Sequence, residues 1–283
     1  MKPAHDHLEP KQFALAVKRL ADALCYGADL SPFLGSGIDY VQSRLYQPGD
    51  AVKAIDWRIT ARSGKTHVKE YESPKQTPIY IVLDTSASMA VKSTKMSKFA
   101  WGVQLATGLG LVAIERMSPV GLMGCGSRKL HLEPSLSKAE VMTWAGELRH
   151  ADLQEGTDLA GTLRSLEAKL HNKSIVLVIS DLHEPESVSA LRRMAAQHEV
   201  ICLLMQDPAE EGRLGGGFFH AREAETGASF VARGSSTWLD SSKVMDQLRR
   251  GGIDSLLLRT DLPFLAKLRH FLKSRDSAGR RRL

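Results

Sequence analysis

The sequence predicts an α/β fold built on a doubly wound, mostly parallel sheet, with an N-terminal extension of one helix and several short strands. Two apolar runs of strand length, IYIVLD at 79–84 and SIVLVISD at 174–181, show no polar alternation, which is typical of strands covered on both faces. Segments with apolar residues at helical spacing lie between such runs. Strands that alternate with helices along a chain form parallel sheets with helices on both faces.

The N-terminal part of the chain differs in character from the rest. Residues 11–25 place apolar side chains at helical spacing and predict an amphipathic helix. Glycines and prolines then separate short segments, such as VQSRLY, AIDWRIT and THVKEY, a pattern typical of short strands and turns. We therefore expect a helix and strand-rich extension at 1–76, an α/β domain at 77–275 and a basic tail at 276–283.

Within the α/β domain, strands and helices are expected to alternate. Ser93 or Thr94 is expected to cap the first helix, and Pro119 to stop it. The strands are expected at 79–84, as a short pair within 120–133, and at 174–181, 199–205 and 253–259. The helices are expected at 94–117, 137–150, 158–170, 185–197, near 240–250 and from 260.

The stretch from Asp207 to Thr237 is rich in glycine and serine and is predicted to be a loop. It contains GRLGGGFF at 212–219, which lacks the Lys-Ser/Thr pair of a P-loop. No phosphate site is therefore predicted there.

Composition limits the function classes. The net charge of +6 permits an anionic partner, but no Lys/Arg stripe with interleaved aromatics appears, so nucleic-acid binding is not predicted. No apolar run reaches the roughly 18 residues of a membrane span. The N-terminus, MKPAHDHLEPK, lacks the basic head and apolar body of a signal peptide. We expect a cytoplasmic protein with Cys25, Cys125 and Cys202 as reduced thiols.

Two of the predicted buried strands end in an acid, Asp84 and Asp181. Ligands of open α/β sheets bind beyond the carboxyl ends of the strands, so both carboxylates are expected in one crevice. Ser86 and Ser88 follow Asp84 at every second position, and alternate residues of an extended turn point the same way. Thr157 follows a glycine ahead of a predicted helix and adds a third hydroxyl.

This set offers only hard oxygen donors, which suits Mg²⁺, with Mn²⁺ and Ca²⁺ as alternatives, and disfavours zinc. Because hydroxyls are neutral, the charge of the ion is only partly compensated, and the ion is expected to attract an acidic side chain of a partner protein. The site is thus predicted to bind, with no catalytic residue. The expected metal ligands are Asp84, Ser86, Ser88, Thr157 and Asp181.

Other interpretations of the motif are weighed against this one. A D-x-S-x-S motif alone is more often a helix cap or a turn, but its place directly after a buried strand favours the metal site. A Mg²⁺-dependent phosphohydrolase of the haloacid-dehalogenase type would use Asp84 as its nucleophile. That chemistry needs a second acid two residues on, and position 86 is serine. The G-x-S-x-G elbow of serine hydrolases and the H-E-x-x-H and C-x-x-C zinc motifs are missing.

The motifs DTSAS, the GT of EGTD, and ISD resemble the metal-ion-dependent adhesion site of von Willebrand factor A domains at all five positions. The strand pair within 120–133 is similar to that family's antiparallel hairpin. The upstream stretch SRLYQPGDAVKAIDWRITARSGKTHVKEYE resembles the signature of the bacterial domain-of-unknown-function family number fifty-eight, which joins this block to an A-type domain. The resemblance spans about Gly35 to Phe271 and implies a von Willebrand factor A-like, Rossmann-type fold.

The resemblance also implies a function. Members of that family commonly lie beside MoxR-type AAA+ ATPases, which implies that they act together in protein assembly or maturation. We therefore expect a non-enzymatic, metal-dependent protein-interaction module that acts with a MoxR-type AAA+ ATPase in assembly, maturation or remodelling of a client protein. Many members carry membrane segments before this block, and none is predicted here.

The upstream block is dense in charged residues. For any single one, the expectation is an ion pair on an exposed strand, worth under about 1 kcal/mol. For the block as a whole, the hypothesis is that it braces or extends the A-type domain and offers a second contact face. The residues concerned are Arg44, Asp50, Asp56, Arg58, Arg62, Lys69 and Glu70.

Overall fold

The computed structural model describes residues 8–25, 39–72, 77–125, 131–150, 153, 158–211, 218–222, 229–233 and 241–279. Its centre is a six-stranded sheet in the spatial order β10-β7-β6-β3-β4-β5. Neighbouring strands are parallel except for β4 and β5, which confirms the predicted mostly parallel sheet with an antiparallel pair. The strands are β3 (Ile79–Leu83), β4 (Val120–Gly124), β5 (His131–Ser135), β6 (Ile175–Ser180), β7 (Glu199–Gln206) and β10 (Asp254–Arg259).

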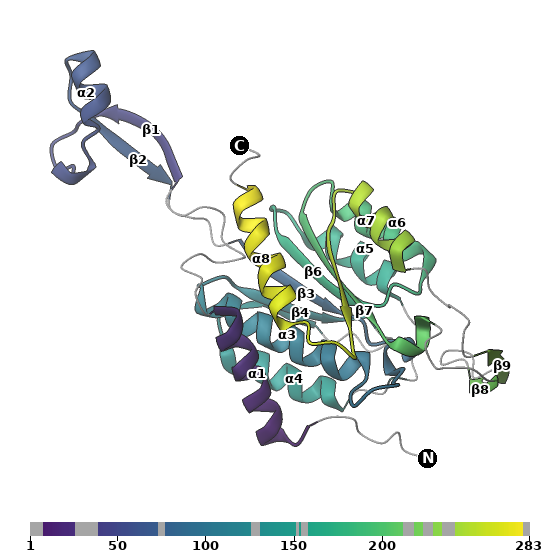
Figure 1. The fold of residues 1–283 in the computed structure, drawn as a ribbon. Helices are drawn as coiled ribbons and strands as arrows, with labels where there is room; N and C mark the ends of the chain where they lie inside the picture. The colour runs from purple at the N-terminus through teal and green to yellow at the C-terminus, as the bar shows by residue number, and fades with distance from the viewer. Residues whose placement is uncertain are drawn as a thin grey trace.

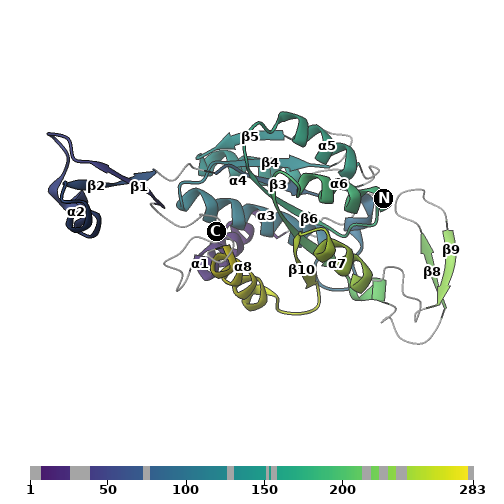
Figure 2. The same cartoon turned by 90° about the horizontal axis from the view of Figure 1, so that it is seen from above.

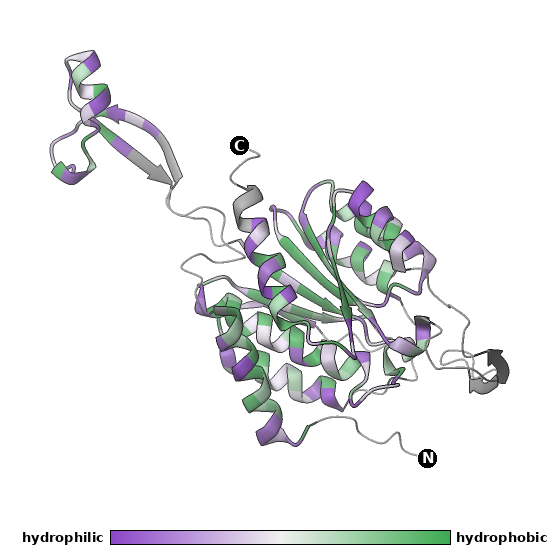
Figure 3. Ribbon diagram, viewed as in Figure 1, coloured by the Kyte–Doolittle hydropathy of each residue, from purple (hydrophilic) through white to green (hydrophobic). Residues whose placement is uncertain are grey.

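Helices cover both faces of the sheet (Figure 1). Alternate residues of a strand point to opposite faces, so the buried residues form two clusters. Leu177 of β6 belongs to the cluster on one face, and its neighbours Val176 and Val178 belong to the other. Figure 3 shows the hydrophobic strands between the two layers of helices. One layer holds α1 (Pro10–Cys25), α3 (Lys98–Glu115), α4 (Lys138–Arg149) and α8 (Leu265–Gly279), and the other holds α5 (Leu159–Lys169), α6 (Pro185–Met194) and α7 (Ser241–Arg250).

Helix α3 is buried along most of its length, as expected for a helix that is apolar on nearly all sides. The predicted caps, Ser93 and Thr94, are wrong. Ser97 is the N-cap, and its Oγ accepts a hydrogen bond from the N–H of Ala100 at 3.1 Å. The helix therefore starts later than predicted, and Ser93 is left to bond elsewhere.

Helix α1 packs on the α/β domain. Phe13 and Val17 are buried in the same apolar cluster as α3 and α8, and the helix contacts both of them. Leu20 lies directly over Gly108 of α3, where a Cβ atom would meet the Leu20 side chain. The sequence groups this helix with the strands that follow it, but its apolar face is covered by helices from much later in the chain.

Residues 39–72 form a small unit that we call the head. Strands β1 (Asp39–Leu45) and β2 (His67–Glu72) pair antiparallel, with the short helices η1 (Val52–Ala54) and α2 (Trp57–Ser63) between them. Figures 1 and 2 both show the head apart from the six-stranded sheet. The prediction of short strands and turns is wrong at AIDWRIT, because the Asp56 carboxylate accepts bonds from the N–H groups of Arg58 and Ile59 and so caps a helix.

Part of the predicted loop from Asp207 to Thr237 has regular structure. Strands β8 (Phe218–Arg222) and β9 (Ser229–Arg233) pair antiparallel, and η3 (Pro208–Glu211) follows β7. The glycines at 215–217 lie outside the described residues.

At the C-terminal end, α8 continues to Gly279, into the predicted basic tail. Cys125 and Cys202 are buried free thiols, as expected, and the side chain of Cys25 lies outside the described residues. In the part of the chain that the structure describes, no helix has an apolar stretch long enough to cross a bilayer.

Two glycines of α3 give a matched test of this packing. A Cβ on Gly102 would lie 2.7 Å from Leu83 Cδ1, whereas a Cβ on Gly110 would lie 3.4 Å from Val141 Cγ1. We expect Gly102→Val to lower the free energy of unfolding by about 1–3 kcal/mol, because it overpacks the contact between α3 and β3. Gly110→Ala is expected to be neutral or to stabilise by up to about 1 kcal/mol, since alanine favours the helix. Urea unfolding measures both, and equal effects of the two changes would contradict this packing.

Candidate metal centre

The candidate site lies where the chain reverses direction across the sheet. Strand β3 pairs with β4 on one side and with β6 on the other, so the connections leaving β3 and β6 diverge there. In open α/β sheets, a crevice for ligands forms at such a point, beyond the carboxyl ends of the strands. Asp84 follows the last residue of β3, and Asp181 follows the last residue of β6.

Four of the five predicted ligands lie in one hydrogen-bonded chain. The Asp84 carboxylate accepts a bond from the N–H of Ser86 at 3.0 Å. The hydroxyls of Ser86 and Ser88 are 2.9 Å apart, and Ser88 in turn bonds to Asp181. All four residues are buried, the most exposed being Ser88 at 7%. The two strand ends and the turn η2 (Ala87–Ala90) therefore bring these oxygens together.

The carboxylate of Asp84 is buried and lies close to the negative charge of Asp181. Burial, followed by the charge of Asp181, raises the pKa of Asp84 to about 6, although hydrogen bonds from Ser180 and Ser86 act in the opposite direction. The Ser180 hydroxyl donates to Asp84 Oδ2 at 2.5 Å. A carboxylate with a raised pKa and no cationic neighbour among the described residues is a group that a bound cation would stabilise.

Thr157, the fifth predicted ligand, lies outside the described residues. The next residue, Asp158, caps α5, with its Oδ1 accepting a bond from the N–H of Gly161 at 3.0 Å. The N–H of Asp158 also donates to the carbonyl of Cys125, the residue after β4, at 3.2 Å.

A buried lysine is the main feature that the sequence reasoning missed. Lys98, the first residue of α3, has a side chain with 0% exposure. Its Nζ lies 2.7 Å from Asp181 Oδ2 and also bonds to Glu210 Oε1. Burial acts to lower the pKa of Lys98, but the two carboxylates outweigh it, and the pKa is raised. Burial likewise acts to raise the pKa of Asp181, but Lys98 and then His183 outweigh it, so that this pKa is lowered.

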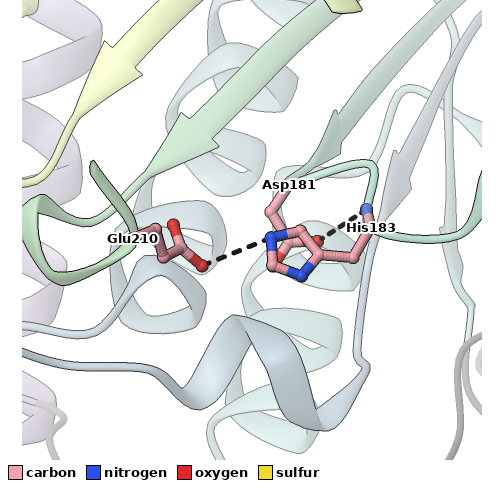
Figure 4. Close-up of side chains that lie close together, drawn as sticks. All are labelled: Asp181, His183 and Glu210. Atoms are coloured by element: carbon pink, nitrogen blue, oxygen red, sulfur yellow. Dashed lines mark hydrogen bonds and ion pairs between the residues drawn. The ribbon is translucent and has the colours of Figure 1, made fainter. Parts of the chain in front are cut away.

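Glu210 of η3 joins the same cluster from the end of β7. Its Oε1 lies 3.4 Å from His183 Nε2, and its Oε2 accepts a bond from the N–H of Asp207 at 2.9 Å. Figure 4 shows Asp181, His183 and Glu210 close together. One possible ligand atom from each of the three lies within 4.8 Å of the others. Because two of these three groups already bind the Lys98 ammonium, a cation between them would have to compete with a resident positive charge.

Asp207 connects the neighbouring strand ends through hydrogen bonds. Its carboxylate accepts bonds from the N–H and hydroxyl of Ser93, which lies in the loop before α3. It also accepts a bond at 3.1 Å from the hydroxyl of Thr260, directly after β10. The carboxyl ends of β3, β6, β7 and β10 are thus joined by one polar network.

The residues present fit a hard divalent cation. Asp84, Ser86, Ser88 and Asp181 supply carboxylate and hydroxyl oxygens, with neither sulfur nor imidazole nitrogen among them. His183 lies beside Asp181, but its Nε2 is 3.4 Å from Glu210 Oε1 and it is not one of these four residues. The donor set therefore matches Mg²⁺, Mn²⁺ or Ca²⁺ better than zinc.

The sequence signal for Lys98 is weak. A positive side chain at the first residue of a helix opposes the helix dipole, and Lys98 is followed at once by apolar residues. The sequence predicts a helix start at 94, however, so it does not place Lys98 at that position or show that Lys98 is buried. No such signal marks Glu210, because its role depends on the turn after β7.

Comparison with known proteins agrees with this architecture. The family model described as "Protein of unknown function DUF58" matches residues 42–237. The uncharacterized protein Mb1516 of Mycobacterium bovis is 25% identical over 278 residues, covering 92% of this chain and 87% of its own length.

Among solved structures, the conserved hypothetical protein BatB from Bacteroides thetaiotaomicron has a TM-score of 0.50 at 14% identity, covering 71% of this chain and 99% of that one. A von Willebrand factor type A protein from Catenulispora acidiphila has a TM-score of 0.40 at 16% identity, covering 75% and 44% of the two chains. The parallel sheet with its antiparallel edge pair gives the α/β domain a von Willebrand factor A-like fold. Since the family model spans most of its residues, the chain belongs to the family described as protein of unknown function DUF58.

Proposed function

We propose that this protein is a non-enzymatic interaction module that binds a protein partner through a divalent cation. The observation that carries the proposal is the hydrogen-bonded chain from Asp84 through Ser86 and Ser88 to Asp181 at the switch point of the sheet. These side chains, with Thr157, would hold Mg²⁺, Mn²⁺ or Ca²⁺. When bound, the cation would offer a coordination position to an acidic side chain of the partner.

The charges around the site support this role. The negative charge of Asp181 is balanced by its ion pair with Lys98, and the two serine hydroxyls are neutral. Two of the four described ligands are carboxylates. Of these two, Asp84 is the one without a cationic neighbour among the described residues. A divalent ion is then left with uncompensated charge, which favours an added carboxylate. The side chain of His183, 30% exposed, marks the side from which a partner would approach.

Phosphohydrolase chemistry has no support in the arrangement. The position two residues after Asp84, where a leaving group would need an acid, is Ser86, whose hydroxyl contacts Ser88. The structurally nearest acid, Asp181, is engaged by Lys98 and has a lowered pKa, which makes it a poor proton donor. Binding therefore accounts for this site better than catalysis does.

The partner that the family resemblance favours is a MoxR-type AAA+ ATPase, with a client protein that the pair assembles, matures or remodels. In this proposal the ATPase supplies nucleotide binding, since the described residues contain no P-loop. This chain then contributes recognition through the metal centre.

Asp84→Ala is expected to weaken Mg²⁺ binding at least about 100-fold, because it removes a carboxylate ligand. Binding of the ATPase is expected to be lost with it, whereas the fold is retained. Titration calorimetry with Mg²⁺ and Mn²⁺, and a pull-down of the purified ATPase with and without chelator, measure the two effects.

Asp261→Ala is the matched control for this change. Asp261 follows β10 at the same edge of the sheet but pairs with Arg259, at 2.8 Å, outside the metal centre. This variant is expected to bind metal and partner as the unmodified protein does. If Asp84→Ala bound both as tightly as the unmodified chain, or if chelator left partner binding unchanged, the proposed function would be wrong.

Lys98→Met tests the buried ion pairs. It leaves Asp181 and Glu210 buried without a cation, so the free energy of unfolding is expected to fall by about 3–5 kcal/mol. Added Mg²⁺ or Mn²⁺ is expected to raise the melting temperature of this variant more than that of the unmodified protein, because the ion can take over part of the lost positive charge. Thermal unfolding with and without metal measures both.

Lys138→Met serves as the control for Lys98→Met. Lys138 pairs with Glu115 at 3.0 Å on the surface, with the two side chains 56% and 45% exposed. Its loss is expected to cost less than about 1 kcal/mol. Similar losses of stability in the two variants would show that Lys98 contributes no more than a surface ion pair.

A further inference from the structure

The head exposes an unusual share of large hydrophobic side chains. Val52 and Trp57 are 68% and 67% exposed, and Leu45 and Tyr46 are 53% and 38% exposed. These four make up half of the large exposed hydrophobic side chains that the described residues show. Figure 3 shows hydrophobic residues at η1 and along α2. Exposed apolar side chains concentrated in one small part of a chain are typical of interaction surfaces.

The head has almost no core in which to bury them. Between residues 42 and 69, where its side chains are described, only Asp56 and Val68 are buried. A unit of fewer than about 40 residues cannot build an adequate core without a disulfide, a metal or a partner, and residues 39–72 contain no cysteine. The exposed apolar groups are therefore available to be covered by another surface.

Polar contacts nevertheless fix the shape of this unit. The Nη1 and Nη2 atoms of Arg44 each donate to the Asp50 carboxylate at 2.8 Å, and so does the N–H of Gln47. The Arg44 hydrogen bonds, with that of Gln47, lower the pKa of Asp50 to about 2. Asp56 accepts from the Ser43 hydroxyl at 2.8 Å as well as capping α2. The segment that carries Val52 and Trp57 is thus pre-organised, which favours a shape-specific partner.

The same contacts leave the part of the head between residues 42 and 69 positive. The acids Asp39, Glu70 and Glu72 lie at the far ends of β1 and β2. Between residues 42 and 69, Asp50 and Asp56 are the only acids, and both are engaged within the head. The exposed cations of this part have no ion-pair partner among the described residues. A chain with a net charge of +6 disfavours a second copy of itself as the occupant. These cations are Lys53, Arg58, Arg62 and Lys65.

We propose that the head docks an acidic protein surface, with an apolar pocket for Trp57 and Val52 and with carboxylates facing Arg58 and Arg62. Tryptophan and arginine are the residue types that most often dominate binding energy at interfaces. A nucleic acid would gain little from Val52 and Leu45, because binding to bases rests on aromatic stacking. A membrane surface is disfavoured because α2 has only 7 residues, too short for an interfacial amphipathic helix. The proposal does not rest on the metal centre.

The first experiment identifies what lies against Trp57. In the test variant, the photo-cross-linking residue p-benzoylphenylalanine replaces Trp57 of the full chain. In the control variant it replaces Leu262. Both variants are cross-linked inside the cells that make the protein. Leu262 is 52% exposed and follows β10, far from the head in sequence. We expect an adduct at position 57 but not at 262, and mass spectrometry is expected to place it on an acidic protein surface.

The second experiment measures binding of that purified protein to the full chain. Trp57→Ala, and Arg58→Glu combined with Arg62→Glu, are each expected to raise the dissociation constant at least about tenfold. The charge reversal is also expected to weaken the salt dependence of binding. Asp261→Ala, which lies outside both the head and the metal centre, is expected to bind this partner normally. The matched basic control, Arg192→Glu with Arg250→Glu on α6 and α7, is expected to change binding less than about twofold.

Several outcomes would overturn the proposal. One is an adduct with the chain itself, within one molecule or between two copies. Others are an adduct with lipid or nucleic acid, or binding to phosphatidylglycerol vesicles that Trp57→Ala abolishes. Unchanged affinity in both head variants, with unfolding curves that match the unmodified protein, would also contradict it.

Discussion

The structure depends on a single positive charge placed where water does not reach it. The Lys98 ammonium lies between Asp181 and Glu210, and leaving it unpaired would cost several kcal/mol in lost hydration. The start of α3, the end of β6 and the turn after β7 are therefore fixed relative to one another. The same charge keeps Asp181 ionised close to Asp84, so two acids can share one crevice. The candidate metal centre exists in this form because Lys98 balances the charge of one of its carboxylates.

Much of the fold could be predicted from the sequence, because unbroken apolar strands and periodic helices are local patterns. β3 and β6 are examples. Their unbroken apolar runs indicate buried strands, and the acids Asp84 and Asp181 mark where these strands end. The sequence does not predict the cap of α3 correctly, because Ser93, Thr94 and Ser97 are all good capping residues. In the structure Ser93 bonds to Asp207 instead, and Ser97 caps the helix. The helix at AIDWRIT was missed because its short length gives no periodicity, although Asp56 and Gly64 are ordinary boundary residues.

For the site, the sequence could predict the oxygen donors but not the charges around them. The spacing of Asp84, Ser86 and Ser88 is local, and the strand ends place Asp181 beside them. Lys98 and Glu210 lie far apart in sequence and meet only through the packing of α3 against the turn after β7. The head is similar: its charged residues are plain in the sequence, yet which acids are engaged internally depends on the hairpin. Charge balance is a tertiary property in both places.

The position of α1 has a consequence for how the chain is made. Because α1 and β3 belong to one packed body, the head is an insertion between two parts of that body. Helix α1 is synthesised before its partners α3 and α8. Its apolar face is therefore not fully covered until α8 has been made. Contacts this distant in sequence slow folding, and during that interval Phe13 and Val17 are exposed to chaperones or to misassembly.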